Sequence, residues 1–351
     1  MDTTHNPITP WPGVQPLVTV VVIGRNEGAR LTTCLQSVLA VPMPAGALEV
    51  LYVDSGSSDD SVARAQALGV MTSVVQPVRP SAATGRNAGW RQARGSYVLF
   101  LDGDTLLHPE FLPLALQAME RPDLAIVWGH RRESAPEQSV YVRVLDLDWV
   151  YPPGQTEFCG GDALVRRSVL QAVNGFDETL IAGEEPEMCR RIRARGHRIL
   201  HLDAPMTRHD LAIRSFRPYW RRAFRAGHAY AEVSARFRDT SDPLWQSDAR
   251  RNLVRGALLQ LVPLLLALEW AAGASGLLWL ALAGLTALVL LARTVRHCGW
   301  KSPDRRTLWL YALHSHLQQI PIFWGQLSQR WDAWRGVRRR LIEYKADGDG
   351  C

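Results

Sequence analysis

Two carboxylates separated by one glycine are the clearest chemical signal in the sequence. Asp102 and Asp104 follow the apolar run at residues 97–101, which is typical of a strand. Strand ends open into the ligand crevice of α/β sheets, so we expect both side chains at a solvated edge and outside the core. Carboxylates together with substrate phosphate oxygens are the ligands that Mg²⁺ and Mn²⁺ prefer. The pattern therefore predicts a Mg²⁺ or Mn²⁺ site, and Gly103 leaves room for a phosphate group.

Two earlier segments also end in polar residues. The run at residues 20–23 leads to Asn26 and Glu27, and the run at residues 51–53 leads to Asp54. Glu27 and Asp54 are expected at one sheet edge, where they can accept hydrogen bonds from a base and a ribose. No Gly-x-Gly-x-x-Gly follows the first strand, which argues against a dinucleotide-binding enzyme. Capping of the next helix by residues 57–59 is an alternative use of this segment.

A second acidic site follows much later, where Glu184 and Glu185 stand directly after Gly183. Group transfer by a single displacement needs a base that removes the acceptor proton, while a metal stabilises the departing diphosphate. Two acidic sites are needed, and two are found. The alternative is that these glutamates only begin a helix, where the helix dipole favours negative charge.

Short β-branched runs alternate with helix-like stretches over the first part of the chain. The runs lie at residues 17–23, 47–53, 71–75, 97–101 and 124–127. Helices are predicted at 27–39, 58–68 and 186–195, the first with Leu31, Leu35, Val38 and Leu39 on one face. This order predicts an α/β fold with a mainly parallel, Rossmann-like sheet covered by helices.

Two apolar segments at residues 253–268 and 277–292 are each near the lower length for a membrane span. Basic residues flank the pair on both sides, so two spans that return the chain to the cytoplasm fit the positive-inside rule. A single long tilted helix and a hairpin that only dips into the bilayer are the alternatives.

The segments beside this pair are basic and aromatic. Residues 211–252 and 308–327 read as amphipathic helices on a membrane surface, and Arg335, Arg338, Arg339 and Arg340 close the chain. A soluble packing helix is an equal reading of residues 211–252. We therefore divide the chain into a disordered N-terminus (1–16), a catalytic domain (17–210), interfacial helices (211–252), a transmembrane hairpin (253–292) and a basic membrane-surface region (293–351).

Charge and cysteine content limit the partners and the compartment. The formal net charge of +6 is concentrated beside the apolar segments, which favours lipid headgroups over nucleic acid. The five cysteines are widely spaced and lack a Cys-x-x-Cys pair, so neither a disulfide framework nor a zinc site is expected. The polar, proline-rich start lacks a secretory signal, and the first domain is expected in the cytoplasm.

Taken together, residues 18–210 resemble family 2 glycosyltransferases with the GT-A fold. Their motifs occur here in the family's order: Asn26-Glu27, Asp54, the segment of residues 85–89 with Arg86 and Asn87, and Asp102-Gly-Asp104. Gly24 departs from the family, which more often has proline or a hydroxyl residue there. Residues 158–167 and 174–178 look like acceptor-side segments, and residues 183–188 occupy the place of the catalytic acidic pair.

The resemblance implies a role for each of these residues. Glu185 falls at the position of the catalytic base, with glutamate in place of the usual aspartate, and Glu184 is its rival. The implied donor-binding residues are Asn26, Glu27, Asp54, Arg86, Asn87 and Asp102; the acceptor-side residues are Gly160, Gly161, Asp162 and Trp220; the metal ligands are Asp102, Asp104 and His209. A plain loop histidine is an equal reading of His209.

The expected protein is an inverting glycosyltransferase at the bacterial inner membrane that uses a nucleotide-sugar, with UDP favoured by the resemblance. Its acceptor is expected to be lipid-linked or another glycan close to the membrane. Trp220 and Arg221 reverse the order of the processive motif, which argues against processive synthesis. A sugar-phosphate nucleotidylyltransferase and an inactive membrane scaffold are the alternatives.

Overall fold

The computed structural model describes residues 15–76, 81–180, 182–271 and 277–337. The basic residues Arg338, Arg339 and Arg340 and nearly all of the predicted disordered N-terminus lie outside this part of the chain. The described residues form two compact units. The first holds 15–131, 152–178 and 184–210, and the second holds 132–151, 179–183 and 211–337, each without the residues not described. The first unit ends at Asp210, and two short segments before that residue belong to the second unit; the predicted division of the chain into domains stays a prediction.

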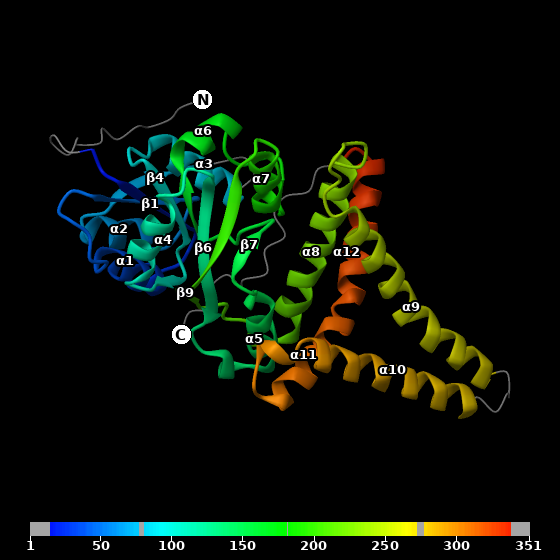
Figure 1. The fold of residues 1–351 in the computed structure, drawn as a ribbon. Helices are drawn as coiled ribbons and strands as arrows, with labels where there is room; N and C mark the ends of the chain where they lie inside the picture. The colour runs from blue at the N-terminus through cyan, green and yellow to red at the C-terminus, as the bar shows by residue number, and fades with distance from the viewer. Residues whose placement is uncertain (1–14, 77–80, 181, 272–276, 338–351) are drawn as a thin grey trace. The chain divides into compact units, whose positions relative to one another are not determined.

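The first half of the sheet in the first unit is parallel, as the sequence predicts. Strands β3 (Met71–Val74), β2 (Leu48–Asp54), β1 (Val18–Gly24) and β4 (Tyr97–Asp102) lie side by side in that order. Most residues of β1 and β4 are buried, because helices cover the sheet (Figure 1). Parallel strands covered on both faces read as continuous apolar runs, which is why the sequence identifies them.

The second half of the sheet is antiparallel, so the expectation of a mainly parallel sheet holds only in part. After β4 come β8 (Ala163–Arg166), β6 (Leu124–Glu133), β9 (Arg198–His209) and β5 (Thr105–Leu107), while β7 (Gly154–Thr156) pairs with β9. Strand β8 lies antiparallel to both β4 and β6. It comes from far along the chain, and it brings residues 160–162 to the end of β4 that carries Asp102.

The helices of the first unit are α1 (Ala29–Leu39), α2 (Ser61–Ala67), α3 (Ala82–Gln92), α4 (Phe111–Ala118), α6 (Arg167–Val173) and α7 (Glu184–Arg193). Helix α1 buries Leu31, Cys34, Leu35 and Val38, whereas Leu39 is exposed at its end. Helix α7 begins two residues before the predicted start. Both glutamates of the acidic pair therefore lie in its first turn, where the helix dipole favours negative charge.

The second unit is helical in its described residues. It contains α5 (Val140–Asp146), α8 (Phe216–Arg236), α9 (Gln246–Ala271), α10 (Leu277–His297), α11 (Arg305–Leu317) and α12 (Gln319–Trp334), with single turns at Pro136–Gln138, Leu147–Trp149 and Gly299–Lys301. The predicted interfacial segment at 308–327 is two helices that break at Gln318. Pro321 lies in the first turn of α12, where its missing N–H costs no helical hydrogen bond.

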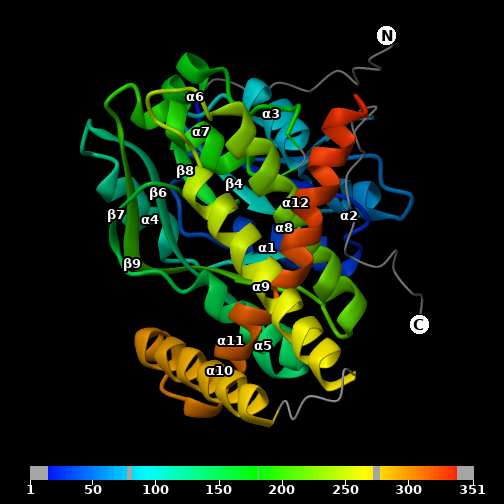
Figure 2. The same cartoon turned by 90° about the vertical axis from the view of Figure 1, so that its right-hand side faces the viewer.

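Helix α12 packs along α8 and α9 (Figure 2). The contact with α8 depends on Gly227 and Gly325. A Cβ atom at Gly227 would stand 2.1 Å from the carbonyl oxygen of Ile322, and one at Gly325 would stand 2.1 Å from that of Phe224. Both distances are far below van der Waals contact, so glycine at these two positions allows the backbones to approach.

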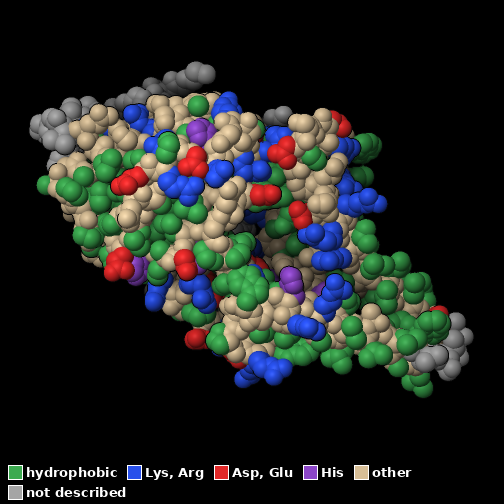
Figure 3. Space-filling model, viewed as in Figure 1, with side chains coloured by type: hydrophobic (Ala, Val, Ile, Leu, Met, Phe, Trp, Pro, Cys, Tyr) green, Lys and Arg blue, Asp and Glu red, His purple; other side chains and the backbone are tan. Residues whose placement is uncertain are grey.

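Helix α9 and residues Trp279–His297 of α10 are long and apolar enough to cross a membrane. Their large apolar side chains are exposed, among them Leu264, Leu268, Trp270, Leu285 and Leu288. Figure 3 shows hydrophobic side chains gathered over these two helices. An exposed apolar surface of this kind marks an interaction site, because water disfavours it.

Candidate active site

The polar ends of three neighbouring strands meet at one edge of the sheet in the first unit. Pairing places Gly24 of β1 opposite Asp54 of β2, and Ile23 of β1 opposite Asp102 of β4. The arrangement follows from parallel strands, whose carboxyl ends point the same way. Asp54 and Asp102 therefore lie at one edge of the sheet, whereas the sequence prediction named Glu27 and Asp54 there; what these residues bind stays a prediction.

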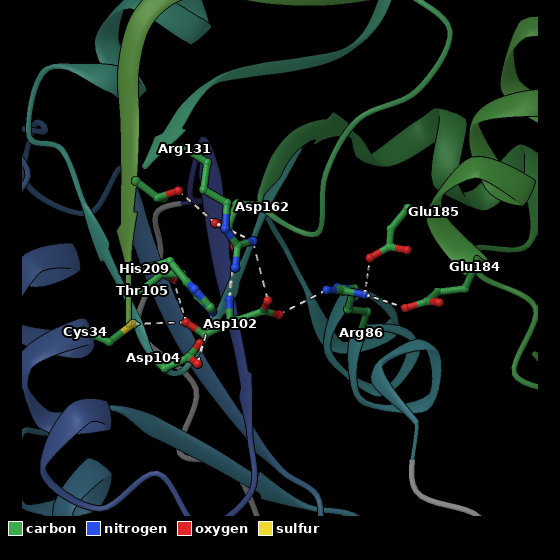
Figure 4. A network of polar contacts seen from close by, with 11 residues as sticks. Cys34, Arg86, Asp102, Asp104, Thr105, Arg131, Asp162, Glu184, Glu185 and His209 are labelled. Atoms are coloured by element: carbon green, nitrogen blue, oxygen red, sulfur yellow. Dashed lines mark hydrogen bonds and ion pairs between the residues drawn. The ribbon is translucent and has the colours of Figure 1, made fainter. Parts of the chain in front are cut away.

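Asp102 lies between two buried arginines (Figure 4). Its Oδ1 is 3.0 Å from Nη2 of Arg86, and its Oδ2 is 3.7 Å from Nη1 of Arg131. The side chain keeps 30% of its surface exposed, as expected for a residue that meets a ligand. Burial raises the pKa of Asp102, but the charges of Arg86 and Arg131 outweigh it and hold the pKa below its usual value. The carboxylate therefore stays ionised.

Asp104 is placed differently from the sequence prediction. We expected a solvated carboxylate, but Asp104 is buried, with its Oδ2 3.2 Å from Nε2 of His209. The reason is the short strand β5, which follows Asp104 directly and pairs Thr105 with His209 of β9. The structure thus places His209 in contact with Asp104, and its predicted role as a metal ligand stays a prediction.

The side chains present fit a divalent cation whose remaining ligands come from the substrate. In the described part of the chain, no group of three or more His, Cys, Asp or Glu side chains is arranged to hold a metal ion. Mg²⁺ and Mn²⁺ bound with nucleotides commonly use one or two carboxylates plus phosphate oxygens, rather than a full protein cage. Asp102 supplies a partly exposed, ionised oxygen ligand of that kind.

Arg86 connects this edge to the second acidic site. Its side chain is only 2% exposed, and its Nη1 lies 3.0 Å from Oε1 of Glu184 and 3.1 Å from Oε1 of Glu185. Burial lowers the pKa of Arg86, but the surrounding carboxylates outweigh it and raise the pKa above its usual value. A Cβ atom at Gly161 would stand 2.5 Å from Arg86 Nη2, so glycine there makes room for the guanidinium.

The two glutamates differ in access to solvent. The side chain of Glu185 is 20% exposed and that of Glu184 is 6% exposed. A base must reach the proton that it removes, so this difference favours Glu185.

Asp162 lies beneath Asp102 as a buried support. Its Oδ1 accepts a hydrogen bond from the backbone N–H of Asp102 at 3.2 Å, and its Oδ2 accepts one from Oγ1 of Thr207 at 2.8 Å. Nη1 of Arg131 is 3.3 Å from the same Oδ2. Burial raises the pKa of Asp162. The acceptor contact that the resemblance implies stays a prediction, which this buried position does not favour.

Sequence reasoning missed Arg131 and Thr207. Arg131 lies in β6 and is buried, although arginine is rarely buried without a charged partner. Its signal was an arginine within a strand whose other residues are mostly apolar. Its partners Asp102 and Asp162 come from β4 and from the turn before β8, and no local pattern indicates that these segments are neighbours.

The donor-side residues Asn26, Asp54 and Asn87 mainly hold loops in this structure. Asp54 is buried, and its carboxylate accepts hydrogen bonds from the Tyr52 hydroxyl, the backbone N–H groups of Gly56 and Ser57, and the Ser57 hydroxyl. Asn26 accepts a hydrogen bond from the N–H of Ser58 at 2.8 Å. Their contacts with a base and ribose stay predictions.

Asn87 is fully buried and makes hydrogen bonds through both ends of its amide. Its nitrogen donates to Phe176 O and to Glu178 Oε1, and its oxygen accepts from the Phe176 N–H and from Trp90 Nε1. It therefore positions the segment at residues 174–178. The predicted contact with the diphosphate stays a prediction that this position does not favour.

Of the remaining predicted residues, Glu27 lies close to Asp102 and Asp104, since a Cβ atom at Gly103 would stand 3.2 Å from its Cγ. Glu27 is buried, with Oε2 2.9 Å from Nη2 of Arg30. Gly160 borders open space, which suits a site that admits a ligand. Trp220 belongs to α8 of the second unit, where it contacts Phe216, and its acceptor role stays a prediction.

Comparison with known proteins identifies the family. Residues 19–173 match glycosyl transferase family 2, and residues 97–314, more than half of the chain, match glycosyl transferase family group 2. The chain belongs to glycosyltransferase family 2. It is therefore a glycosyltransferase that uses a nucleotide-sugar donor, as the sequence motifs predict.

Individual relatives in the family are distant. The glycosyltransferase AglE of Haloferax volcanii is 23% identical over 243 residues, which cover 62% of this chain and 74% of AglE. The pre-mycofactocin glycosyltransferase of Mycobacterium tuberculosis is 28% identical over 243 residues, or 65% of this chain. That match spans only 49%, about half, of the relative's length.

Among solved structures, the mannosyltransferase PcManGT from Pyrobaculum calidifontis has a similar fold. The TM-score is 0.65 at 21% sequence identity, and the match covers 93% of this chain and 90% of that one. This likeness confirms the predicted GT-A fold followed by C-terminal helices.

Proposed function

We propose that the protein transfers a sugar, with inversion, from a nucleoside diphosphate sugar to a hydroxyl group of an acceptor at a membrane. The observation that carries this proposal is the partly exposed carboxylate Asp102 at the donor edge, joined through Arg86 to the more exposed glutamate Glu185. One acidic group suits a cation with its diphosphate, and the other suits a base.

In the proposed reaction, Glu185 accepts the proton of the acceptor hydroxyl. The acceptor oxygen then forms a bond to the anomeric carbon, while the bond from that carbon to the diphosphate oxygen breaks. The nucleoside diphosphate leaves with the bonding electrons. A divalent cation at Asp102 would supply charge stabilisation to the departing diphosphate.

The donor nucleotide is a separate question. The family resemblance favours UDP, whereas the structure of PcManGT was solved in complex with GDP-Man and Mn²⁺. Both nucleotides therefore belong in the test, with Mn²⁺ as the cation.

The exposed apolar helices support a membrane acceptor. Helix α9 and most of α10 are long enough to cross a bilayer, and basic residues flank the pair. A bilayer would cover surface that water disfavours, and the positive-inside rule would then place the first unit on the cytoplasmic side. A lipid-linked acceptor would reach the enzyme from the same membrane.

The test uses the full chain in detergent with a panel of UDP-, GDP- and dTDP-sugars and Mn²⁺. We expect slow release of nucleoside diphosphate from one donor class, and EDTA should abolish it. The Glu185→Gln variant, purified in parallel, controls for contaminating hydrolases. Absence of metal-dependent binding and hydrolysis across the whole panel would support the inactive-scaffold alternative.

A further inference from the structure

The guanidinium of Arg86 contacts both acidic sites. It lies 3.0 Å from Asp102 Oδ1 on the donor side, and 3.0 and 3.1 Å from Glu184 and Glu185 on the other side. Figure 4 shows the guanidinium between these carboxylates. The three carboxylates come from two elements, the end of β4 and the start of α7.

A direct contact between Arg86 and the donor phosphates does not fit this geometry. The side chain is 2% exposed, Nη2 is engaged by Asp102, and Nη1 is engaged by both glutamates. The ring of Phe176 covers the guanidinium at 5.7 Å, and Gly161 closes in at the Nη2 side. An arginine that binds phosphate presents its planar fork to the ligand, whereas here Nη1 and Nη2 face protein carboxylates and Nε is buried.

We propose that Arg86 is a positioning residue, which fixes the base Glu185 relative to the cation ligand Asp102 without touching the donor. This inference rests on the proposed function. A planar guanidinium has five donors in a rigid fork, so it can hold carboxylates from two elements in one geometry. Because transfer requires the acceptor oxygen to approach the anomeric carbon closely, a small displacement of the base lowers turnover strongly.

The proposal predicts that removing the charge of Arg86 does not weaken cation binding. A positive charge beside Asp102 opposes the binding of a cation there, whereas an arginine that binds the diphosphate would strengthen binding of the nucleotide. Replacement of Arg86 by an uncharged residue should therefore leave Mn²⁺ affinity unchanged or raise it by about 3- to 10-fold. Turnover should fall by about 10- to 1,000-fold because the base is no longer held in place.

The experiment uses the full chain in detergent and compares wild type with Arg86→Met and Arg86→Lys. Electron paramagnetic resonance of Mn²⁺ gives the dissociation constants of Mn²⁺ with and without UDP or GDP, independently of activity. Donor hydrolysis gives kcat and KM. Arg86→Lys keeps the charge but loses the fork, so it should bind Mn²⁺ and nucleotide within about 3-fold of wild type, with kcat at least about 10-fold lower.

Two further variants control for folding. Arg86→Met removes the positive charge that balances the nearby buried carboxylates. The double variant Arg86→Met/Glu184→Gln, which also removes one negative charge, is therefore made beside it. If the single variant does not fold, the double variant should fold, and its kcat should still be lower than that of wild type. Arg91→Met removes an exposed arginine of the same helix, whose partner is Glu178 at 3.1 Å, and should match wild type in both measurements.

Two results would overturn the proposal while leaving the proposed function intact. A loss of nucleotide affinity of about 10-fold or more in Arg86→Met, restored by Arg86→Lys, would make Arg86 a phosphate ligand. Turnover within about 3-fold of wild type in both Arg86→Lys and the double variant would make it a structural residue only. Failure of the wild-type chain itself to bind Mn²⁺ with either nucleotide would instead overturn the proposed function, and this inference with it.

Discussion

Nη1 of Arg86 lies 3.1 Å from Oε1 of Glu185, although the two residues are 99 positions apart in the sequence. The same guanidinium holds Asp102, so the proposed base and the proposed cation ligand have a common partner. The two acidic sites are separate in the sequence. In the structure one buried charge contacts both.

Glu185→Gln keeps the shape of the side chain but removes the basicity that proton transfer needs. We expect turnover to fall by about 10²- to 10⁴-fold, the usual contribution of a general base. Calorimetry with UDP or GDP and Mn²⁺ should show a change in dissociation constant of no more than a few fold. Glu184→Gln is the matched control and should lower turnover less, because Glu184 is the more buried of the two. If Glu184→Gln is inactive and Glu185→Gln turns over normally, the base is Glu184.

Asp102→Asn should remove Mn²⁺-dependent nucleotide binding with little loss of stability, because its side chain is partly exposed. Asp104→Asn should weaken the same binding and also lower the melting temperature, since Asp104 is buried against His209. A buried polar group that loses a hydrogen-bond partner commonly costs about 1–3 kcal/mol. Titration calorimetry and thermal melts of both variants separate the two effects. Nucleotide affinity equal to wild type in both would remove the cation site from the proposed function.

His201 should make the first unit less stable in mild acid. Its ring is buried, stacks on Trp128 with centroids 4.1 Å apart, and has Nδ1 2.9 Å from the carbonyl oxygen of Pro152. Burial lowers the pKa of His201 below its usual value near 6.5. As the pH falls below about 6.5, His201 is protonated in the unfolded chain before it is protonated in the folded protein. Protonation therefore favours the unfolded state. The free energy of unfolding is highest above pH 6.5 and falls as the pH drops toward the pKa of His201 in the folded protein.

The measurement is the midpoint of denaturant unfolding between pH 7.5 and pH 5. His201→Phe retains an aromatic ring against Trp128 but cannot be protonated, so its stability should depend less on pH than that of wild type. His130 is partly exposed, its ring centroid lies 4.8 Å from that of His201, and its Nε2 lies 2.9 Å from Asp203, so both proteins are compared in a His130→Phe background that removes this second imidazole. Equal pH dependence in the two proteins would contradict the prediction.

Leu285→Asp together with Leu288→Asp should weaken membrane attachment. Both leucines are exposed on α10, so the substitutions remove little packing within the protein. Placing an aspartate in the centre of a spanning helix costs about 2.5–3.5 kcal/mol, which opposes entry of α10 into the bilayer. The measurement is the fraction of protein that pellets with membranes after a carbonate wash.

The control for this experiment is Leu114→Asp, which changes an exposed leucine on α4 of the first unit. It should pellet like wild type. If the double α10 variant also pellets like wild type, the apolar face of α10 is not what attaches the protein to membranes.

The sequence alone determined features that depend on neighbouring residues. The runs of β1, β2 and β4 are mostly apolar because these strands are covered on both faces, and Asp54 and Asp102 end two of them. The buried face of α1 and the two long apolar helices were also readable, because side-chain periodicity and span length are local properties. The order of polar motifs was enough to indicate the family.

Only the tertiary structure decided which charged residues, distant in the sequence, contact each other. Strand β8 enters between β4 and β6, and this places Asp162 under Asp102 and Arg131 beside both. Arg86 lies 16 positions from Asp102 and 98 from Glu184, and Asp104 is buried by the pairing of β5 with β9. Local patterns carry no information about these pairings, since they depend on strand order and on how buried charges are compensated once the chain is folded. The physical reason is that a carboxylate or guanidinium is stable in the interior only beside an opposite charge or enough hydrogen-bonding groups, and the fold determines which of these it meets.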